Sequence, residues 1–295
     1  MRYSRYLVLY AVLIFSADAA AAGIDVLREH YRELTGNIAS NPFGMPLRVQ
    51  SEEQGGNVSA EIFAVLDQPF AAVTSLLGDA QRWCGFLLLN INVKSCTVEK
   101  NAAGVWLTLY IAPKEYKSPD EAYKTRYLFH ASRSAQYIEV FFDADRGPLG
   151  TRDSHIRLDA LGIEGRTLVH FTSAMRLGAV SHIAITTYLA TLGRNKTGFS
   201  NVPDANGKLG PVRGLQAMIE RNAVRYFLAL QVDLETRALP AAGRFEQQMH
   251  RWYELTQRFP QLYDLPKADY VANKRRERDN QLELQRSIDN VKARQ

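Results

Sequence analysis

The sequence predicts an α+β fold in which an antiparallel sheet of up to eight strands is combined with a long helix toward the C-terminus. Two observations support this prediction. Residues 47–175 contain short apolar or alternating segments separated by turn signals, which is typical of strands. Residues 212–290 contain long segments with helical spacing of apolar residues. Because helices do not alternate with the strands, a parallel α/β sheet is not expected.

The N-terminus has the pattern of a cleaved signal peptide. Two arginines precede an apolar segment at 6–15, and small residues then allow cleavage after Ala19 or Ala22. The alternative, a membrane anchor, is disfavoured because a spanning helix needs about 20 apolar residues. We therefore expect residues 1–22 to be removed and the mature protein to be exported, either to the periplasm or out of the cell.

Before the main sheet, the chain predicts one helix, one hairpin and a second helix. Apolar residues at helical spacing predict a helix at 24–36. A glycine-rich connection joins two apolar segments, 47–52 and 58–66, as a β-hairpin. Pro69 is well suited to a helix N-terminus and favours a helix at 70–78.

The rest of the sheet is predicted between residues 90 and 175. Apolar segments alternate there with turn signals such as those at 101–104 and 117–120. We expect six strands, at 90–98, 105–112, 123–132, 137–143, 154–161 and 167–175.

Helices are predicted at 180–192, 212–234, 244–259 and 267–290. The helix at 212–234 is long enough to cross the sheet. The helix at 267–290 is charged on nearly every side, which predicts a solvated or frayed helix. A contact between this basic helix and a membrane surface or a partner protein is the alternative.

The chain contains two cysteines, Cys84 and Cys96. In an oxidising compartment such a close pair favours a disulfide between a helix and the next strand. A redox pair usually has C-x-x-C spacing, and a metal site needs further ligands at matching spacings, so both alternatives have less support.

Composition and motifs disfavour several functions. The formal net charge of +5 is a small excess without the clustered basic and aromatic pattern of a nucleic-acid binder. The sequence has no nucleophile elbow, zinc-protease motif, phosphate loop or dinucleotide fingerprint. We therefore expect no nucleic-acid partner, no cofactor, no metal and no catalytic residue of these common classes.

Several segments together resemble exported bacterial members of the START-like, polyketide-cyclase-like (SRPBCC) superfamily. The resemblance covers roughly residues 45–235, and it is carried by residues 60–70, 83–84, 92–96, 188–194 and 221–227. It implies a helix-grip fold, in which a curved antiparallel sheet wraps around a long C-terminal helix. The domains would then be a signal peptide at 1–22, a helix-grip domain at 23–238 and a C-terminal helical extension at 239–295.

The chain departs from this superfamily in two respects. Most such domains are cytoplasmic, whereas this chain has the signal of an exported protein. The helix at 180–192 also lies between the last strand and the long helix, where the superfamily has no helix, and its role is open.

The resemblance also implies a cavity between the sheet and the long helix that holds a lipid, a sterol or an aromatic polyketide without reaction. Strand alternation leaves open which sheet face lines it. The candidate cavity residues are Trp106, Tyr110, Arg126, Tyr127, Phe129, Tyr137, Glu139, Phe141, Arg157, His170 and Tyr226.

Two alternatives to a carrier or sensor remain. One is a protein-interaction module without a ligand. The other is a cyclase-type enzyme, which would require the strand histidines His130, His155 and His170 to converge in the cavity.

Overall fold

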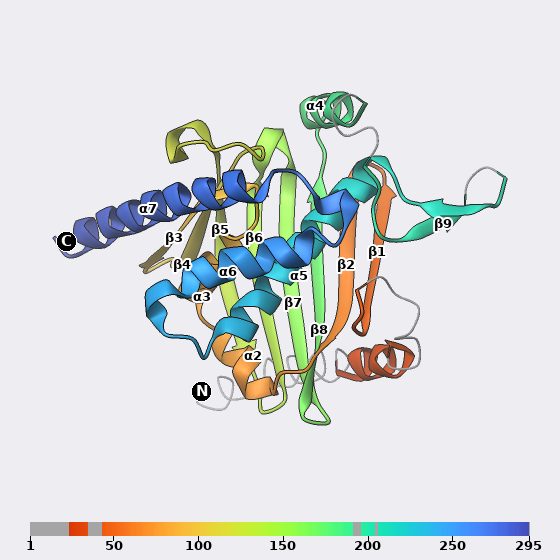
Figure 1. The fold of residues 1–295 in the computed structure, drawn as a ribbon, viewed down its shortest axis with the longest axis horizontal. Coiled ribbons are helices and arrows are strands. Elements are labelled where there is room, and N and C mark those ends of the chain that lie inside the picture. The colour runs from red at the N-terminus through yellow and green to blue at the C-terminus, as the bar shows by residue number, and fades with distance from the viewer. Residues whose placement is uncertain (1–23, 35–42, 191–195, 204–205, 295) are drawn as a thin grey trace, which may run out of the picture.

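The computed structural model describes residues 24–34, 43–190, 196–203 and 206–294 (Figure 1). The signal peptide predicted at 1–22 and the predicted end of the first helix at residue 36 lie outside these residues.

One antiparallel sheet of eight strands dominates the fold, in the order β1-β2-β8-β7-β6-β5-β4-β3. The eight-stranded sheet predicted from the sequence is thus confirmed. The strands are β1 (Leu47–Gln54), β2 (Asn57–Leu66), β3 (Val93–Asn101), β4 (Gly104–Ile111), β5 (Tyr123–Arg133), β6 (Tyr137–Arg146), β7 (Arg152–Ile163) and β8 (Arg166–Arg176).

The strand boundaries follow local turn chemistry. The strand predicted at 90–98 begins only at Val93, because the side-chain oxygen of Asn90 accepts a hydrogen bond from the backbone of Asn92 and turns the chain. A tight turn with Gly55 and Gly56 at positive φ joins β1 to β2.

Helices cover one face of the sheet, which we call the inner face. The long helix α5 (Gly214–Thr236) packs on β1, β2 and β8, as the helix-grip fold requires. The short helices α2 (Phe70–Leu77) and α3 (Ala80–Leu87) pack mainly on β6–β7 and β3–β4, and α6 (Ala241–Thr256) packs on α5. The side chain of Asp79 caps α3 by accepting a hydrogen bond from the backbone of Gln81.

The N-terminal helix, residues 24–34, lies on the opposite face of the sheet, which we call the outer face. Its apolar residues Leu27, Tyr31 and Leu34 are buried against a cluster that includes Phe63 and Leu168. The first residues of the described chain are therefore an integral part of the fold.

The connection between β8 and α5 is elaborate. It contains α4 (Ala179–Ala190) and a small hairpin of β9 (Asn201–Pro203) and β10 (Leu209–Pro211), and both stand away from the sheet in Figure 1. The helix was predicted from the sequence and the hairpin was not, because each of its strands is only three residues long.

The last helix, α7 (Lys267–Lys292), corrects the prediction of a solvated or frayed helix. It packs along the edge strand β3, where Lys274, Glu277 and Gln281 are buried, and its Tyr270 is buried against Trp252 of α6. The charged residues of α7 suggested solvent exposure, but Glu277 pairs with buried Lys94 of β3, which lies far away in the sequence.

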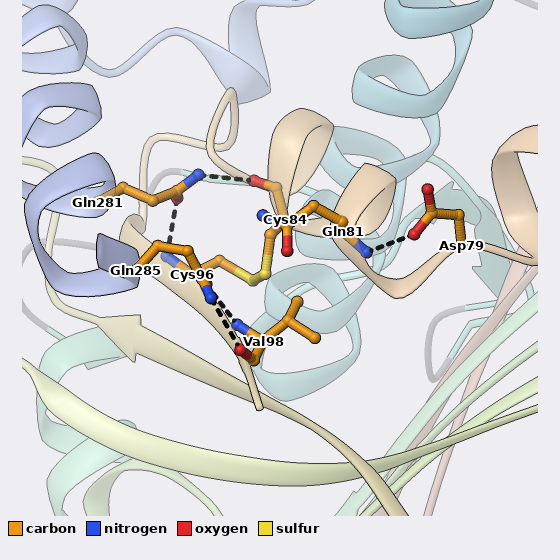
Figure 2. Close-up of a disulfide and its surroundings, with 7 residues drawn as sticks. All are labelled: Asp79, Gln81, Cys84, Cys96, Val98, Gln281 and Gln285. Atoms are coloured by element: carbon orange, nitrogen blue, oxygen red, sulfur yellow. Dashed lines mark hydrogen bonds between the residues drawn. A yellow bond between two sulfur atoms is a disulfide. The ribbon is translucent and has the colours of Figure 1, made fainter. Parts of the chain in front are cut away.

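The predicted disulfide between Cys84 and Cys96 is present and joins α3 to β3 (Figure 2). Both cysteines are completely buried. No described helix has both the length and the hydropathy to cross a membrane.

Candidate functional site

The candidate site is a small cavity between the inner face of the sheet and the helices. Its volume is about 10 Å³, which is about the space of one water molecule. It is lined by Trp83, Leu87, Leu107, Leu109, Tyr127, Phe142, Ile156, Phe171 and Tyr226.

Strand alternation brings the sheet residues of this lining together. On β4, Leu107 and Leu109 point inward, and on β6 the inward residues are buried Val140 and Phe142. Opposite them, α3 supplies Trp83, whose ring centroid lies 4.6 Å from that of Phe142. The aromatic rings of the sheet and of α3 therefore fill most of the space beneath α5.

Polar groups at the cavity are few and uncharged. The hydroxyl of Tyr127 shares a hydrogen bond of 3.0 Å with Ser154. Burial raises the pKa of Tyr127 and Tyr226, so both phenols stay protonated at neutral pH. None of the nine lining side chains is charged, so the cavity favours an uncharged occupant.

Three of the sequence-predicted candidates lie on the inner side. Tyr127 and Tyr226 line the cavity itself. Phe129 shares the inward side of β5 with Tyr127 and packs on Phe142 at a centroid distance of 5.2 Å. Whether any of them contacts a ligand stays a prediction.

The structure places the other eight candidates on the outer face, away from this cavity. Each alternates with buried residues of the inner face, as Glu139 does between Ile138 and Val140. The physical reason is that this face carries the charged side chains, which remain partly in contact with water. The eight residues are Trp106, Tyr110, Arg126, Tyr137, Glu139, Phe141, Arg157 and His170.

Cationic side chains lie over two of the outer-face aromatic residues. The guanidinium of Arg126 lies 4.2 Å from the ring centroid of Trp106, and the ammonium of Lys124 lies 5.6 Å from that of Tyr110. Such cation–π contacts explain how aromatic side chains are accommodated on a solvent-facing sheet.

A polar cluster joins strands β2, β6, β7 and β8 on the outer face. Asp159 accepts hydrogen bonds from Tyr137 at 2.7 Å and from Arg157 at 2.8 Å. The imidazole of His170 lies between two carboxylates, 3.0 Å from Glu61 and 3.4 Å from Asp159. Both ring nitrogens therefore face acceptors, an arrangement that suits the protonated imidazolium.

The hydrogen-bonded pairs of this cluster determine the direction of the pKa shifts of His170 and Asp159. Burial alone would lower the pKa of His170, but its hydrogen bonds to Asp159 and Glu61 raise the pKa overall. Burial alone would raise the pKa of Asp159, but hydrogen bonds from His170, Arg157 and Tyr137 lower it overall. These pairs thus favour the charged forms of His170 and Asp159, with both imidazole nitrogens engaged.

The three strand histidines do not meet in the cavity. His130, His155 and His170 all lie on the outer face, and each belongs to a different strand. Within the described residues there is also no group of three or more histidine, cysteine or acidic side chains placed to hold a metal ion.

Several lining residues were missed by the sequence reasoning, including Trp83, Leu107 and Phe142. A usable signal exists in the strands. On β6 the side with Tyr137 and Phe141 also carries Glu139, whereas the other side is entirely apolar from Ile138 to Ala144. On β6 the uncharged side from Ile138 to Ala144 is the inner one.

No protein-family model matches the chain, and no curated protein matches it. Solved structures similar to it include a STAR-related lipid transfer protein from Xanthomonas axonopodis, which is 15% identical at a TM-score of 0.40 and for which the match covers 64% of this chain and 93% of that one. A second is Ara h 8.0201, which is 9% identical at a TM-score of 0.35; the match covers 64% of this chain and 98% of that one. A third is a norcoclaurine synthase mutant from Thalictrum, which is 11% identical at a TM-score of 0.33; the match covers 50% of this chain and 89% of that one.

The chain has a helix-grip fold, in which an antiparallel sheet is wrapped on the long helix α5. We base that assignment on its own strand order and on the position of α5.

Proposed function

We propose that this protein is an exported carrier or sensor that binds an uncharged apolar ligand between the sheet and α5 and does not chemically change it. One observation carries the proposal: the space enclosed by the helix-grip elements is lined by nine apolar or aromatic side chains and by no charged one. Burial of an apolar ligand there gains about 25 cal/mol per Å².

The lining also limits which lipid fits. A carboxylate or phosphate headgroup needs a cation or several donors when it leaves water. The cations Arg126, Arg157 and His170 lie on the outer face instead. We therefore expect a sterol-like or aromatic molecule, or an apolar chain whose headgroup stays outside the cavity.

The interior is closed, so binding requires movement. A cavity of about 10 Å³ holds no lipid. Trp83 occupies much of the space between α3 and Phe142, with a ring contact of 4.6 Å. We expect displacement of this indole, together with α5, to make room for a ligand.

The closed interior also supports a second candidate, a protein-interaction module that binds no ligand. In that case the filled core is the working state, and α4 with the β9–β10 hairpin supplies surface that stands away from the sheet (Figure 1).

Native mass spectrometry of protein purified from its exported compartment tests both functions. Organic extraction then identifies any apolar molecule that dissociates. A stoichiometric ligand supports the carrier. A clean apo mass, together with no thermal stabilisation by sterols, fatty alcohols or aromatic polycycles, would contradict the carrier and favour the interaction module.

Export itself is part of the proposal. The buried Cys84–Cys96 disulfide is typical of oxidising compartments. Fractionation of cells and N-terminal sequencing of the mature chain test this expectation; a cytoplasmic protein that retains residues 1–22 contradicts it.

A further inference from the structure

The helix α4 stands away from the sheet in Figure 1 and packs mainly on α5 and on the short turn η3 (Pro148–Gly150). Its Ile185 is buried in the core, whereas Ile183 is 66% exposed. Two residues of helix turn the chain by about 200°, so these two isoleucines point to opposite sides of α4. The side of α4 that faces away from the protein therefore presents a large apolar side chain.

The composition of α4 is unusual for a helix that is exposed to water. Residues 177–193 contain no Asp, Glu, Lys or Arg, although the exposed side of a surface helix normally carries charged residues. The hydroxyl of Thr186 donates a hydrogen bond of 2.6 Å to the carbonyl of His182, so this polar group is satisfied within the helix. An apolar helix of this length is typical of a buried core or of a membrane interface. The exposure of Ile183 favours the interface.

Three arginines, which we call the arginine row, lie side by side at the end of the sheet from which α4 leads. Arg146 of β6 is directly opposite Arg152 of β7, and Arg152 is directly opposite Arg176 of β8. All three residues are exposed. Like charges in opposite positions of a sheet are destabilising. Within the described part of the chain no carboxylate forms an ion pair with the row, and this includes the nearby exposed residues Asp145 and Asp153.

The arginine row lies next to α4. Strand β8 ends at Arg176, three residues before α4 begins at Ala179. The turn η3, which α4 contacts, connects Arg146 to Arg152. Apolar surface and unpaired cations are therefore adjacent at one end of the molecule. This combination complements a bilayer with anionic headgroups, because apolar residues enter the headgroup region and cations attract lipid phosphates.

We propose that α4 and the arginine row form a docking surface for a lipid bilayer that contains anionic lipids. Ile183 and the uncharged side of α4 enter the headgroup region, and the three arginines contact lipid phosphates. A bilayer is the favoured occupant because it offers an apolar boundary and phosphates side by side over a continuous surface. The proposal goes beyond the carrier function, because docking needs no ligand in the cavity.

The test measures sedimentation of the full mature chain with lipid vesicles. One set of vesicles contains phosphatidylcholine alone, and the other contains phosphatidylcholine with phosphatidylglycerol. We expect binding to the anionic vesicles and weaker binding to the neutral ones. Binding to the anionic vesicles should decrease as added salt screens the arginines.

Two substitutions with matched controls locate the surface. We expect Ile183→Asp to weaken binding to anionic vesicles at least ~10-fold, because the isoleucine side chain is no longer transferred out of water. Its control is Leu209→Asp, at an apolar residue of β10 that is 68% exposed, which should keep the wild-type affinity. We expect Arg152→Gln to weaken binding ~5-fold, which corresponds to about 1 kcal/mol for one cation. Its control is Arg133→Gln, at an exposed position at the opposite end of the sheet.

Two results overturn the proposal. Absence of binding to both kinds of vesicle would show that α4 does not contact a bilayer, and would favour a protein partner instead. Equal losses in Ile183→Asp and Leu209→Asp would show that binding reflects any exposed apolar residue. All four substituted residues are exposed, so the variants should fold, and thermal denaturation checks this. A clean apo mass would contradict the carrier without changing vesicle binding, so the two proposals fail separately.

Discussion

Tyr127 and Ser154 share a hydrogen bond of 3.0 Å at the wall of the buried cavity. Both side chains are buried, on strands β5 and β7. The substitution Tyr127→Phe leaves the Ser154 hydroxyl without this partner and should cost about 1 kcal/mol of unfolding free energy. Urea denaturation measures this cost.

The control is a double-mutant cycle with Ser154→Ala. If the hydrogen bond is the reason for the cost, the double variant loses less than the sum of the two single variants. Additive losses would show that the bond contributes no coupling.

Trp83 fills the space between α3 and the sheet, so its removal should open the cavity. We expect Trp83→Ala to lower the unfolding free energy by about 3–5 kcal/mol. Added indole should then raise the melting temperature of the variant but not that of the wild type. Thermal denaturation with and without indole measures both effects.

Trp106→Ala is the matched control, because Trp106 lies on the outer face under Arg126. It should cost about 1 kcal/mol, mainly the cation–π contact. No stabilisation by indole is expected for this variant, and equal stabilisation of both would show that the effect is unrelated to the cavity.

Much of the fold was predictable because it follows from local pattern. Strand alternation predicts β5 at 123–132, within one residue of Tyr123–Arg133. The inward face was not predicted, because Tyr137 points outward and is nevertheless buried, beneath the N-terminal helix. A contact between an outer-face residue and a segment 100 residues earlier leaves no periodic trace in the sequence.

The position of α7 was unpredictable for a related reason. Lys274 and Glu277 are residue types of a solvated surface. They are buried because Glu277 also pairs with Lys94, and because the carbonyls of Asn90 and Val93 accept hydrogen bonds from Lys274. Charged residues predict solvent exposure until a distant partner is known.

His170 predicts a pH dependence of stability. Its pKa is raised in the folded state, so its contribution is full below its ordinary value of about 6.5 and is lost as pH rises through the raised value. Its partners Asp159 and Glu61 have lowered pKa values, so their contribution is lost in acid. The cluster should stabilise most between about pH 5 and 6.5.

His170→Gln should therefore cost about 2 kcal/mol at pH 6 and less at alkaline pH. Urea denaturation across the pH range checks this result. His155→Gln is the control, because His155 pairs with Asp143 on the exposed surface and should matter by less than about 1 kcal/mol. A loss at His170 that is the same at pH 6 and pH 9 would contradict the charged cluster.

Lys94 predicts the opposite pH dependence at alkaline pH. Burial, together with the positive charge of Lys274, lowers the pKa of Lys94 from 10.5 to about 8. Between these values the unfolded chain binds more protons than the folded one, so stability should rise with pH by up to about 1.4 kcal/mol per unit.

The window to measure is about pH 7.5 to 9.5, because buried tyrosines with raised pKa values oppose the trend once unfolded tyrosines ionise near pH 10. Lys94→Met should reduce the rise, part of which belongs to buried Lys274 with its own lowered pKa, and be more stable than wild type at pH 7.5, since Glu277 keeps Lys274 as its partner. Lys124→Met, at an exposed site, should keep the wild-type slope, and a wild-type free energy that falls across this window would show that Lys94 does not carry a desolvated charge.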